Sequence, residues 1–529
     1  MPLSVTDPAQ PKHKGRRLRY LCALLTFIFI FWLPDLIESL LIFRSLPDGL
    51  TWEARFNGEG NEQDNPKFLS IDQAGRVLAT GTSYASKEGG SWLAKHDGMT
   101  GRELWRWFSG EAIQAVPLSD KNADVYFAGS ESKGYRSGPL TPPFSGTDTD
   151  FMVGKLSGID GTVAWKTSFD GGYHDTDWAE ALVLGNDGAL VAAGFTPNDT
   201  RYYGCVVKLD ASNGKEIWRH QTDTEAIVFW HGNIALQANN AGDVVFASTR
   251  KAADPFSATT ALWLRKLRRG DGKTVWTTEF PADVAQNHVL HHLGVTPEGD
   301  FIATGHHAKN QGRSLIVAKF AGTDGRVMWR VEIDAKSHET IEPTCLVTHG
   351  ISDVIVGARS WNGSLTAPLF DTWTFRLSGA DGQRIWSKRD SQPSAPIDAG
   401  RLCSTVKLMV GPENTIVSAG SVWNGKSADV RVQWLSGADG TLMKSLNYDG
   451  AAQNHDLFRD AALTGSNDVV VAQSSSRCPS WLMPLKSLIY RLTGGPDWDS
   501  MQSETNELDD RDPFNYDSVL WRAKFLPMR

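Results

Sequence analysis

One short motif recurs through most of this chain and constrains its fold more than any other feature. It places a Gly four positions before a Trp, in a short turn that contains an Asp or Asn, as in the stretch from Lys208 to Trp218. The copies run from Asp97 to Trp105, Asp160 to Trp165, Asp210 to Trp218, Asp271 to Trp276, Asp324 to Trp329 and Asp381 to Trp386. A seventh copy keeps Asp439-Gly440 but has Lys444 in place of the Trp. Such self-similarity is typical of repeat architectures.

Each copy predicts a β-hairpin. Alternating apolar residues lead into the Asp/Gly segment, where Asp and Asn can hydrogen-bond their own backbone and Gly can take the positive φ of a tight turn. The Trp then follows on the outgoing strand. Because its position is the same in every copy, we expect it to form a wedge between repeats that removes a large apolar area from water.

A second hairpin lies between successive Trp-bearing strands. It is clearest at Ala181 to Gly194, and its equivalents lie near residues 68–81, 113–129, 234–248, 292–305, 344–358, 406–420 and 461–473. Four strands per repeat is the content of a propeller blade, and the 3.6-residue apolar period of helical solenoids is absent. The sequence therefore predicts an all-β, eight-bladed β-propeller of four-stranded antiparallel blades over residues 48–498.

The eighth blade is irregular. We expect its third strand at Ser487 to Leu492, but the following segment contains Pro496, and proline is disfavoured in a paired strand. At the other end of the repeats, Leu50 to Phe56 resembles a fourth strand with no blade before it. The simplest solution is that residues 50–56 complete the last blade, which removes exposed strand edges.

The N-terminal region has the pattern of a membrane anchor. Five Lys and Arg residues within positions 1–19 precede apolar residues that extend from Tyr20 to Phe43. As a helix this segment would reach about 36 Å, enough to cross the hydrocarbon core. We expect an uncleaved transmembrane helix over 20–43, with a cleaved signal peptide as the alternative. The positive-inside rule then places residues 1–19 in the cytoplasm and the propeller on the periplasmic or extracellular side of the inner membrane.

Charge and cysteines exclude several functions. A formal charge of −8, without a long basic run after residue 19, argues against nucleic acid as a partner. The cysteines are dispersed, at Cys22, Cys205, Cys345, Cys403 and Cys478, with no CxxC or adjacent pair. Zinc, c-type haem and thioredoxin-like chemistry are therefore unsupported, and the cysteines outside the apolar segment are either free or paired.

The Asp-x-x-x-Gly-x-x-x-Trp copies resemble the tryptophan motif of the quinoprotein dehydrogenase-like superfamily of eight-bladed propellers, with PQQ or BamB-type repeats. The resemblance covers about residues 48–498 and implies the fold. In a pyrroloquinoline quinone (PQQ) dehydrogenase it would also imply bound quinone and Ca²⁺, usually with adjacent cysteines in alcohol-oxidising members. This chain has no adjacent cysteines. We therefore assign no catalytic, cofactor-binding or metal-binding residue and expect no resident cofactor, with PQQ or Ca²⁺ as the alternative.

Local clusters have a functional and a structural interpretation. The carboxylates of Asp175, Asp177 and Glu180 either bind Ca²⁺ or cap a loop before a strand. His288, His291, His292, His306 and His307 crowd one blade, but strand neighbours point to opposite faces, which argues against a paired metal site.

Superposing the hairpins places Asp64, Asp177, His231 and His288 at one equivalent position, just before the innermost strand. This position lies at the mouth of the central channel. The four residues are either solvated loop residues or a polar ring that contacts a ligand.

One face of the ring carries the long connections. Turns within hairpins are short and rich in Gly and Asp, whereas the other connections are longer and carry aromatic residues. Trp361-Asn362-Gly363 and Trp423-Asn424-Gly425 occur at corresponding places in adjacent blades. Because binding residues concentrate on loops held by a rigid scaffold, we expect Trp361 and Trp423 to be anchors for a partner. The alternative is that both rings pack onto their own blades.

The C-terminal region, residues 499–529, is an acidic tail with an apolar and basic end. We expect residues 497–517 to be extended or disordered. The stretch from Val519 to Leu526 either folds back onto the propeller or docks another protein.

Together these features predict a membrane-anchored scaffold that binds other membrane or envelope proteins and is not an enzyme. A carbohydrate-binding or envelope-polymer-binding module and a PQQ-dependent dehydrogenase are the two alternatives.

Overall fold

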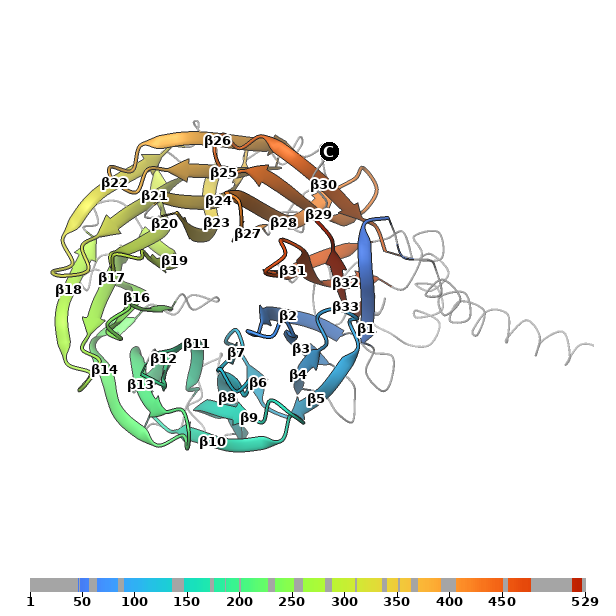
Figure 1. The fold of residues 1–529 in the computed structure, drawn as a ribbon. Helices are drawn as coiled ribbons and strands as arrows, with labels where there is room; N and C mark the ends of the chain where they lie inside the picture. Colours follow the sequence, from blue (N-terminus) through green and yellow to red (C-terminus); the bar gives the residue numbers. More distant parts are fainter. Residues whose placement is uncertain are drawn as a thin grey trace, which may run out of the picture.

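The computed structural model shows antiparallel sheets arranged in a ring (Figure 1). It describes residues 46, 48–56, 64–83, 90–135, 147–171, 176–185, 187–198, 201–226, 234–251, 260–280, 288–309, 312–334, 340–350, 353–362, 370–391, 406–450, 455–476 and 516–525. Every regular element in these ranges is a strand, so none of them contains a helix that could span a membrane. The expected transmembrane segment, residues 20–43, lies outside the described residues.

The strands fall into eight blades, in which the first strand is nearest the centre of the ring. Blade 1 has β2 (Asp64–Ile71), β3 (Val77–Ser83), β4 (Gly90–His96) and β5 (Glu103–Ser109). Blade 2 has the short β6 (Ala112–Ile113) and β7 (Leu118–Ser119), then β8 (Val125–Tyr135), β9 (Thr147–Leu156) and β10 (Val163–Phe169). Blade 3 has β11 (Trp178–Leu184), β12 (Ala189–Asn198), β13 (Arg201–Asp210) and β14 (Glu216–Ala226). Blade 4 has β15 (Ala235–Ala238), β16 (Val244–Lys251), β17 (Thr260–Leu267) and β18 (Thr274–Phe280).

The second half of the ring repeats the arrangement. Blade 5 has β19 (His288–Val295), β20 (Phe301–Lys309), β21 (Gly312–Phe320) and β22 (Val327–Ile333). Blade 6 has β23 (Thr340–His349), β24 (Asp353–Trp361), β25 (Phe370–Leu377) and β26 (Arg384–Ser391). Blade 7 has β27 (Val406–Gly411), β28 (Thr415–Trp423), β29 (Ala428–Ser436) and β30 (Leu442–Tyr448). Blade 8 has β31 (Asp456–Leu463), β32 (Val469–Ser476), β33 (Tyr516–Ala523) and β1 (Leu50–Phe56).

The repeated motif forms the turn between the third and fourth strands. In blade 1 the Asp97 carboxylate accepts hydrogen bonds from the backbone N–H groups of Met99 (3.1 Å) and Thr100 (2.8 Å). The N–H of Gly101 donates to the Asp97 carbonyl at 2.9 Å, and Gly101 has a φ of 72°. This left-handed conformation favours Gly over any residue with a Cβ. The turn therefore satisfies its own polar groups.

Each motif Trp packs against the turn of the following blade, which confirms the expected wedge. A Cβ on Gly161 would lie 2.6 Å from the ring of Trp105, and the Trp105 indole donates to the Gly158 carbonyl at 3.2 Å. The same contact recurs as Trp52–Gly98, Trp165–Ala211, Trp218–Arg269, Trp276–Gly322, Trp329–Gly379 and Trp386–Gly437. Apolar side chains of neighbouring blades fill the space between the sheets, as in the cluster that joins Val417 and Trp434 to Phe458 and Trp521.

Both ends of the described chain meet in blade 8. β1 is its outermost strand and pairs antiparallel with β33, from Leu50 opposite Ala523 to Phe56 opposite Ser518. In Figure 1, β1 (blue) lies beside β33 (red). The ring is thus closed by strands from opposite ends of the sequence, which leaves no open edge at the junction.

The third strand of blade 8 differs from the expectation. It is formed by Tyr516–Ala523 and not by residues 487–492, which lie outside the described residues. The strand is held by burial, because Val519 and Trp521 are fully buried and Trp521 stacks on Tyr448 with ring centroids 5.2 Å apart. A propeller boundary at residue 498 therefore left out a strand that belongs to the ring, and the segment that begins at Val519 does fold back.

Candidate functional site

The two faces of the ring carry different connections. The turns between first and second strands and between third and fourth strands lie on one side, which we call the turn face. The connections from second to third strands and from one blade to the next begin and end on the other side, the loop face. The longest of these connections span residues 136–146, 392–405 and 477–515. The loop face is therefore the side with room for variable binding residues.

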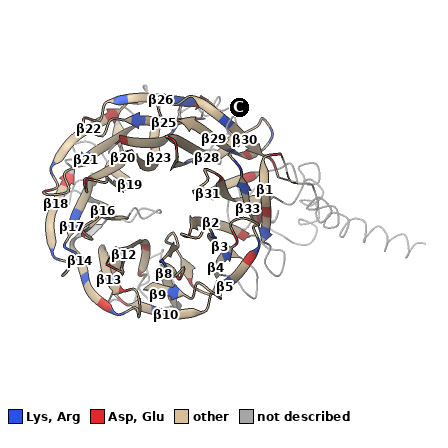
Figure 2. Ribbon diagram, viewed as in Figure 1, with Lys and Arg blue, Asp and Glu red and all other residues tan. Residues whose placement is uncertain are grey.

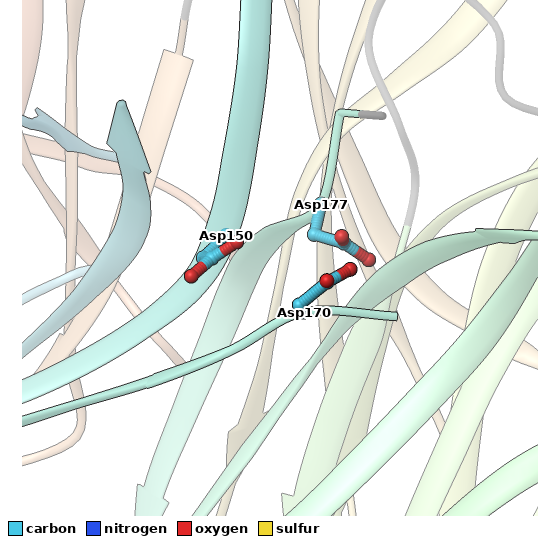
Figure 3. Close-up of side chains that lie close together, drawn as sticks. All are labelled: Asp150, Asp170 and Asp177. Carbon is cyan, nitrogen blue, oxygen red and sulfur yellow. The ribbon is translucent and has the colours of Figure 1, made fainter. Parts of the chain in front are cut away.

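Three aspartates meet on the loop face between blades 2 and 3. Asp150 lies on β9, Asp170 follows β10 and Asp177 precedes β11, and one carboxylate oxygen of each lies within 4.8 Å of the others (Figure 3). We call this group the Asp177 triad. Asp177 is fully buried, whereas Asp170 is exposed.

Backbone contacts hold Asp177 in place. Its N–H donates to the Thr149 carbonyl at 2.8 Å, and the Thr149 hydroxyl donates to the Asp177 carbonyl at 3.0 Å. The N–H of Gly171 donates to the Asp177 carboxylate at 3.1 Å, and a Cβ on Gly171 would lie 2.5 Å from that carboxylate. A side chain at position 171 would therefore clash with the Asp177 carboxylate, so this position requires Gly.

A second triad of the same construction lies between blades 7 and 8. Asp429 lies on β29, Asp449 follows β30 and Asp456 begins β31, again with oxygens within 4.8 Å of one another. We call it the Asp456 triad. The N–H of Gly450 donates to the Asp456 carboxylate at 2.5 Å, and the side-chain amide of Gln473 donates to it at 2.9 Å.

One sequence pattern underlies both triads. Asp170-Gly171 stands seven positions before Asp177, and Asp449-Gly450 stands the same distance before Asp456. Asn57-Gly58 precedes Asp64 with this spacing too, although residues 57–63 lie outside the described residues. Superposition of the hairpins alone did not select Asp456, but this Asp-Gly-x5-Asp spacing identifies it.

Burial controls the electrostatics of the Asp456 triad. It raises the pKa of Asp456 to about 8, against the lowering effects of Ser475, Gly450 and Arg55. It also raises the pKa of Asp429, although Asn424 and Ser427 hydrogen-bond its carboxylate. With a pKa of about 8, Asp456 keeps its proton at neutral pH, so the triad carries less than its full formal charge.

The other expected site residues are more buried than the sequence indicates. Asp64 and His288 occupy the same place as Asp177, at the start of an innermost strand, and all three are fully buried. The expectation of solvated loop residues is therefore wrong for these three. His231 lies outside the described residues.

The histidines of blade 5 form two close pairs. The rings of His288 and His307 lie 5.1 Å apart, and His307 Nε2 lies 3.0 Å from a carboxylate oxygen of Glu332. His291 occupies a bulge in β19, and its Nε2 lies 2.8 Å from His306 Nδ1. Burial lowers the pKa of His291 to about 3 and that of His306 to about 4, so both rings are neutral and share a hydrogen bond.

The two expected anchor tryptophans are held against their blades. Trp361 ends β24, is half-buried and stacks on Phe370 with centroids 6.3 Å apart. Trp423 ends β28, is only 8% exposed and stacks beside His455. For Trp423 the expectation of an exposed loop residue is wrong, because the strand extends to include it.

Among the residues that the structure describes, the two Asp triads bring three metal-ligating side chains within reach of one ion. The sequence left open whether Asp175, Asp177 and Glu180 bind Ca²⁺ or cap a loop. Glu180 instead accepts hydrogen bonds from the Trp178 indole (2.7 Å) and the Ile234 N–H (3.4 Å), and Asp175 lies outside the described residues. The true neighbours of Asp177 are Asp150 and Asp170. Oxygen-rich sites suit Ca²⁺, but this ion takes six to eight ligands and each triad supplies three carboxylates.

The residues do not fit the cysteine arrangement that the family resemblance implies for alcohol-oxidising enzymes. Cys205 and Cys345 are free, buried and in different blades. Burial raises the pKa of both thiols, that of Cys205 to about 12, so they are unreactive at neutral pH. We therefore assign no quinone reaction to these residues.

Comparison with known proteins gives one family match and several solved structures of low similarity. Residues 260–478 match the family model described as outer membrane protein assembly factor BamB. No curated protein matches the sequence. Among solved structures, BamB from Moraxella catarrhalis is 13% identical, with a TM-score of 0.43 over 91% of this chain and 98% of that chain.

Two further solved structures are similar. A quinohemoprotein alcohol dehydrogenase from Pseudomonas putida HK5 is 10% identical, with a TM-score of 0.46 over 91% of this chain and 82% of that chain. Sqt1 from Chaetomium thermophilum is 11% identical, with a TM-score of 0.47 over 80% of this chain and 97% of that chain. Identities this low transfer neither ligand nor activity. The repeated motifs and the ring of blades show that the chain is a β-propeller, of which residues 260–478 match this family model.

Proposed function

We propose that the protein is a membrane-tethered, extracytoplasmic scaffold whose loop face binds another protein of the envelope. The observation that carries this proposal is the difference between the two faces. Every long connection joins strand ends on the loop face, whereas the motif turns on the opposite face use their own side chains to satisfy their backbone. The description of the matching family as an assembly factor supports a scaffolding role.

The distribution of charge favours a protein partner over a polyanion. Lys and Arg alternate with Asp and Glu around the outer strands, without a continuous basic zone (Figure 2). On the loop face, Asp170 and Asp449 present exposed carboxylates at two junctions of the ring. A partner with cationic side chains opposite these positions would be electrostatically complementary.

Site-specific photocrosslinking in intact cells tests the proposal. A photoreactive phenylalanine analogue replaces Lys426, which is exposed on the loop face, and in a matched variant replaces Lys273, which is exposed on the turn face. We expect discrete protein adducts from position 426 and none of the same mass from position 273. Adducts from position 273 alone would contradict the assignment of the face.

The same experiment separates the alternatives. Protease-sensitive adducts support a protein partner, whereas adducts that only a polysaccharide-degrading enzyme removes would support the envelope-polymer alternative. The dehydrogenase alternative predicts a new absorbance band and dye reduction with alcohols or sugars after PQQ and Ca²⁺ are added.

The side of the membrane is tested independently. A reporter that is active only in the cytoplasm, fused after Arg529, is expected to be inactive. Activity of this reporter would place the propeller in the cytoplasm and overturn the extracytoplasmic part of the proposal.

A further inference from the structure

The apolar N-terminal segment joins the propeller at its turn face. β1 begins there, since the N–H of Lys524 donates to the Gly49 carbonyl at 3.1 Å, just beyond the end of β33. Close by, the Trp52 indole donates to Gly98 in the motif turn of blade 1 at 3.0 Å. The chain that precedes Leu50 therefore connects beside the first motif turn.

This part of the turn face carries the two most exposed large apolar side chains among the described residues. Two positions before the positive-φ Gly, the motif turns of blades 1 and 2 have Met99 and Ile159, which are 74% and 90% exposed. The equivalent residues in blades 3 to 7 are Ser212, Gly270, Thr323, Ala380 and Ala438. Single exposed apolar residues are common on protein surfaces. Here, however, the two large ones stand on consecutive blades beside the junction with the N-terminal segment.

The connection to that segment is short. Residues 44–49 separate Phe43, the last residue of the apolar stretch, from the start of β1. Six residues span about 20 Å when fully extended. If residues 20–43 cross a membrane, the turn face at blades 8 and 1 lies within that distance of its surface.

We propose that the turn face at blades 1 and 2 rests on the membrane, with Met99 and Ile159 inserted at the level of the lipid headgroups. This inference rests on the membrane tether of the proposed function and adds the orientation of the ring. A short tether keeps the contact at high effective concentration, so a small apolar patch is sufficient.

Insertion of apolar side chains, and not attraction to anionic lipid, contributes most to the binding of the turn face to the membrane. Exposed Arg102 and Lys121 flank the two turns, but Asp97 and Asp160 lie within them, so opposite charges nearly balance. The proposed orientation directs the loop face away from the membrane, where it is accessible to a partner.

Lipid quenching of site-directed fluorophores tests this orientation in the full chain reconstituted into vesicles. The background carries Cys22→Ser, Cys403→Ser and Cys478→Ser, whereas Cys205 and Cys345 are buried and stay. A polarity-sensitive dye is attached to Met99→Cys or Ile159→Cys. The controls are Ala380→Cys, the equivalent turn position in blade 6, and Lys426→Cys on the loop face. The vesicles are phosphatidylcholine and phosphatidylglycerol with brominated acyl chains as quencher.

We expect quenching at positions 99 and 159 to exceed that at 380 and 426 by about two-fold or more. Equal quenching at the four positions, or the strongest quenching at 426, would overturn the orientation. Alkaline carbonate extraction tests the tether separately. If the protein stays in the membrane but the dyes at 99 and 159 are not quenched, the membrane tether stands and the proposed contact face is refuted. If the protein is released, and the dyes at 99 and 159 are quenched when vesicles are added back, the tether is refuted and the contact face stands. Release without such quenching refutes both.

Discussion

Trp434 lies directly opposite Lys444 in the sheet of blade 7, in the reverse order to the pair found in the other blades. Elsewhere the cation is on the third strand and the Trp on the fourth, as in Lys95–Trp105, Lys155–Trp165, Lys208–Trp218, Lys266–Trp276, Lys319–Trp329, Arg376–Trp386 and Arg522–Trp52. Both members still reach blade 8, because the Trp434 indole donates to the Asn467 carbonyl at 3.1 Å and Lys444 donates to the Lys524 carbonyl. In the seventh copy of the motif the Trp and the cation have therefore exchanged strands, and both are still present.

This exchange predicts strong coupling between the two positions. Trp434→Lys alone would bury a second cation in place of an indole that is fully buried. We expect it to lower the free energy of unfolding by about 3 kcal/mol or more. The double variant Trp434→Lys/Lys444→Trp restores the pair of the other blades and should recover at least half of the loss. A double-mutant cycle measured by urea denaturation checks this, and additive effects would contradict it.

The closing strand gives a second prediction. Trp52→Phe keeps most of the apolar contact with Gly101 but loses the hydrogen bond to Gly98, which we expect to cost about 1 kcal/mol. Trp52→Ala also leaves a cavity and should cost about 3–5 kcal/mol. Trp105→Phe is the matched control at an internal junction of the ring.

Deletion of residues 45–57 removes the whole strand and exposes the edge of β33. This variant should melt at a lower temperature and aggregate more readily than one that retains residues 45–57. Equal melting temperatures for the two proteins would show that β1 does not hold the ring closed.

The sequence predicts the blades well because each one depends on a local device. A tight turn needs Asp and Gly, and the space between two twisted sheets needs a large apolar wedge, so both leave a fixed spacing in the chain. β33 leaves no such trace. It is separated from β32 by residues 477–515, and no fourth strand follows it in the sequence, because β1 supplies that strand from the other end of the chain.

The site is less predictable because its residues come from different strands. Asp177 can be selected from the repeat, but its partner Asp150 lies on another blade, and a bridge between Thr149 and Thr176 joins the two segments. The repeated Trp-Asn-Gly tripeptide predicts that Trp423 is a loop residue, yet the strand includes Trp423 and the ring is buried. In both cases tertiary packing decides a property that local sequence does not contain.

The raised pKa of Asp456 predicts a pH dependence of stability. The pKa is about 8 in the folded protein and near 3.9 in an unfolded chain, so the folded state binds more protons between these values. The contribution of Asp456 to the free energy of unfolding should therefore fall as pH rises from about 4 to about 8, by up to about 1.4 kcal/mol per pH unit. Above pH 8 the contribution levels off.

Asp456→Asn removes this titration. It also removes one acceptor for the Gly450 and Gln473 donors, so its absolute stability is lower at acidic pH. The informative quantity is the difference between wild type and variant, which should shrink or reverse as pH rises from 5 to 8. Asp170→Asn, the same substitution at an exposed member of the other triad, is the matched control. A constant difference across this range would mean that Asp456 is ionised in the folded protein.

The last prediction distinguishes the two loop-face tryptophans, which the sequence treats as equivalent. Trp423 is almost fully buried, so Trp423→Ala should lower the melting temperature markedly, at a cost of about 3–5 kcal/mol, through the cavity that it leaves. Trp361 is half-buried, and its indole nitrogen, which is shielded from solvent, has no hydrogen-bond partner among the residues that the structure describes. A partner carbonyl or carboxylate could accept that bond after a small movement of the ring. We therefore expect Trp361→Ala to reduce photocrosslinking from position 426 several-fold with a smaller change in melting temperature, and Trp361→Phe to reduce it as well. If Trp361→Ala destabilises the protein as much as Trp423→Ala and leaves crosslinking unchanged, Trp361 is structural and the contact with the partner lies elsewhere on the loop face.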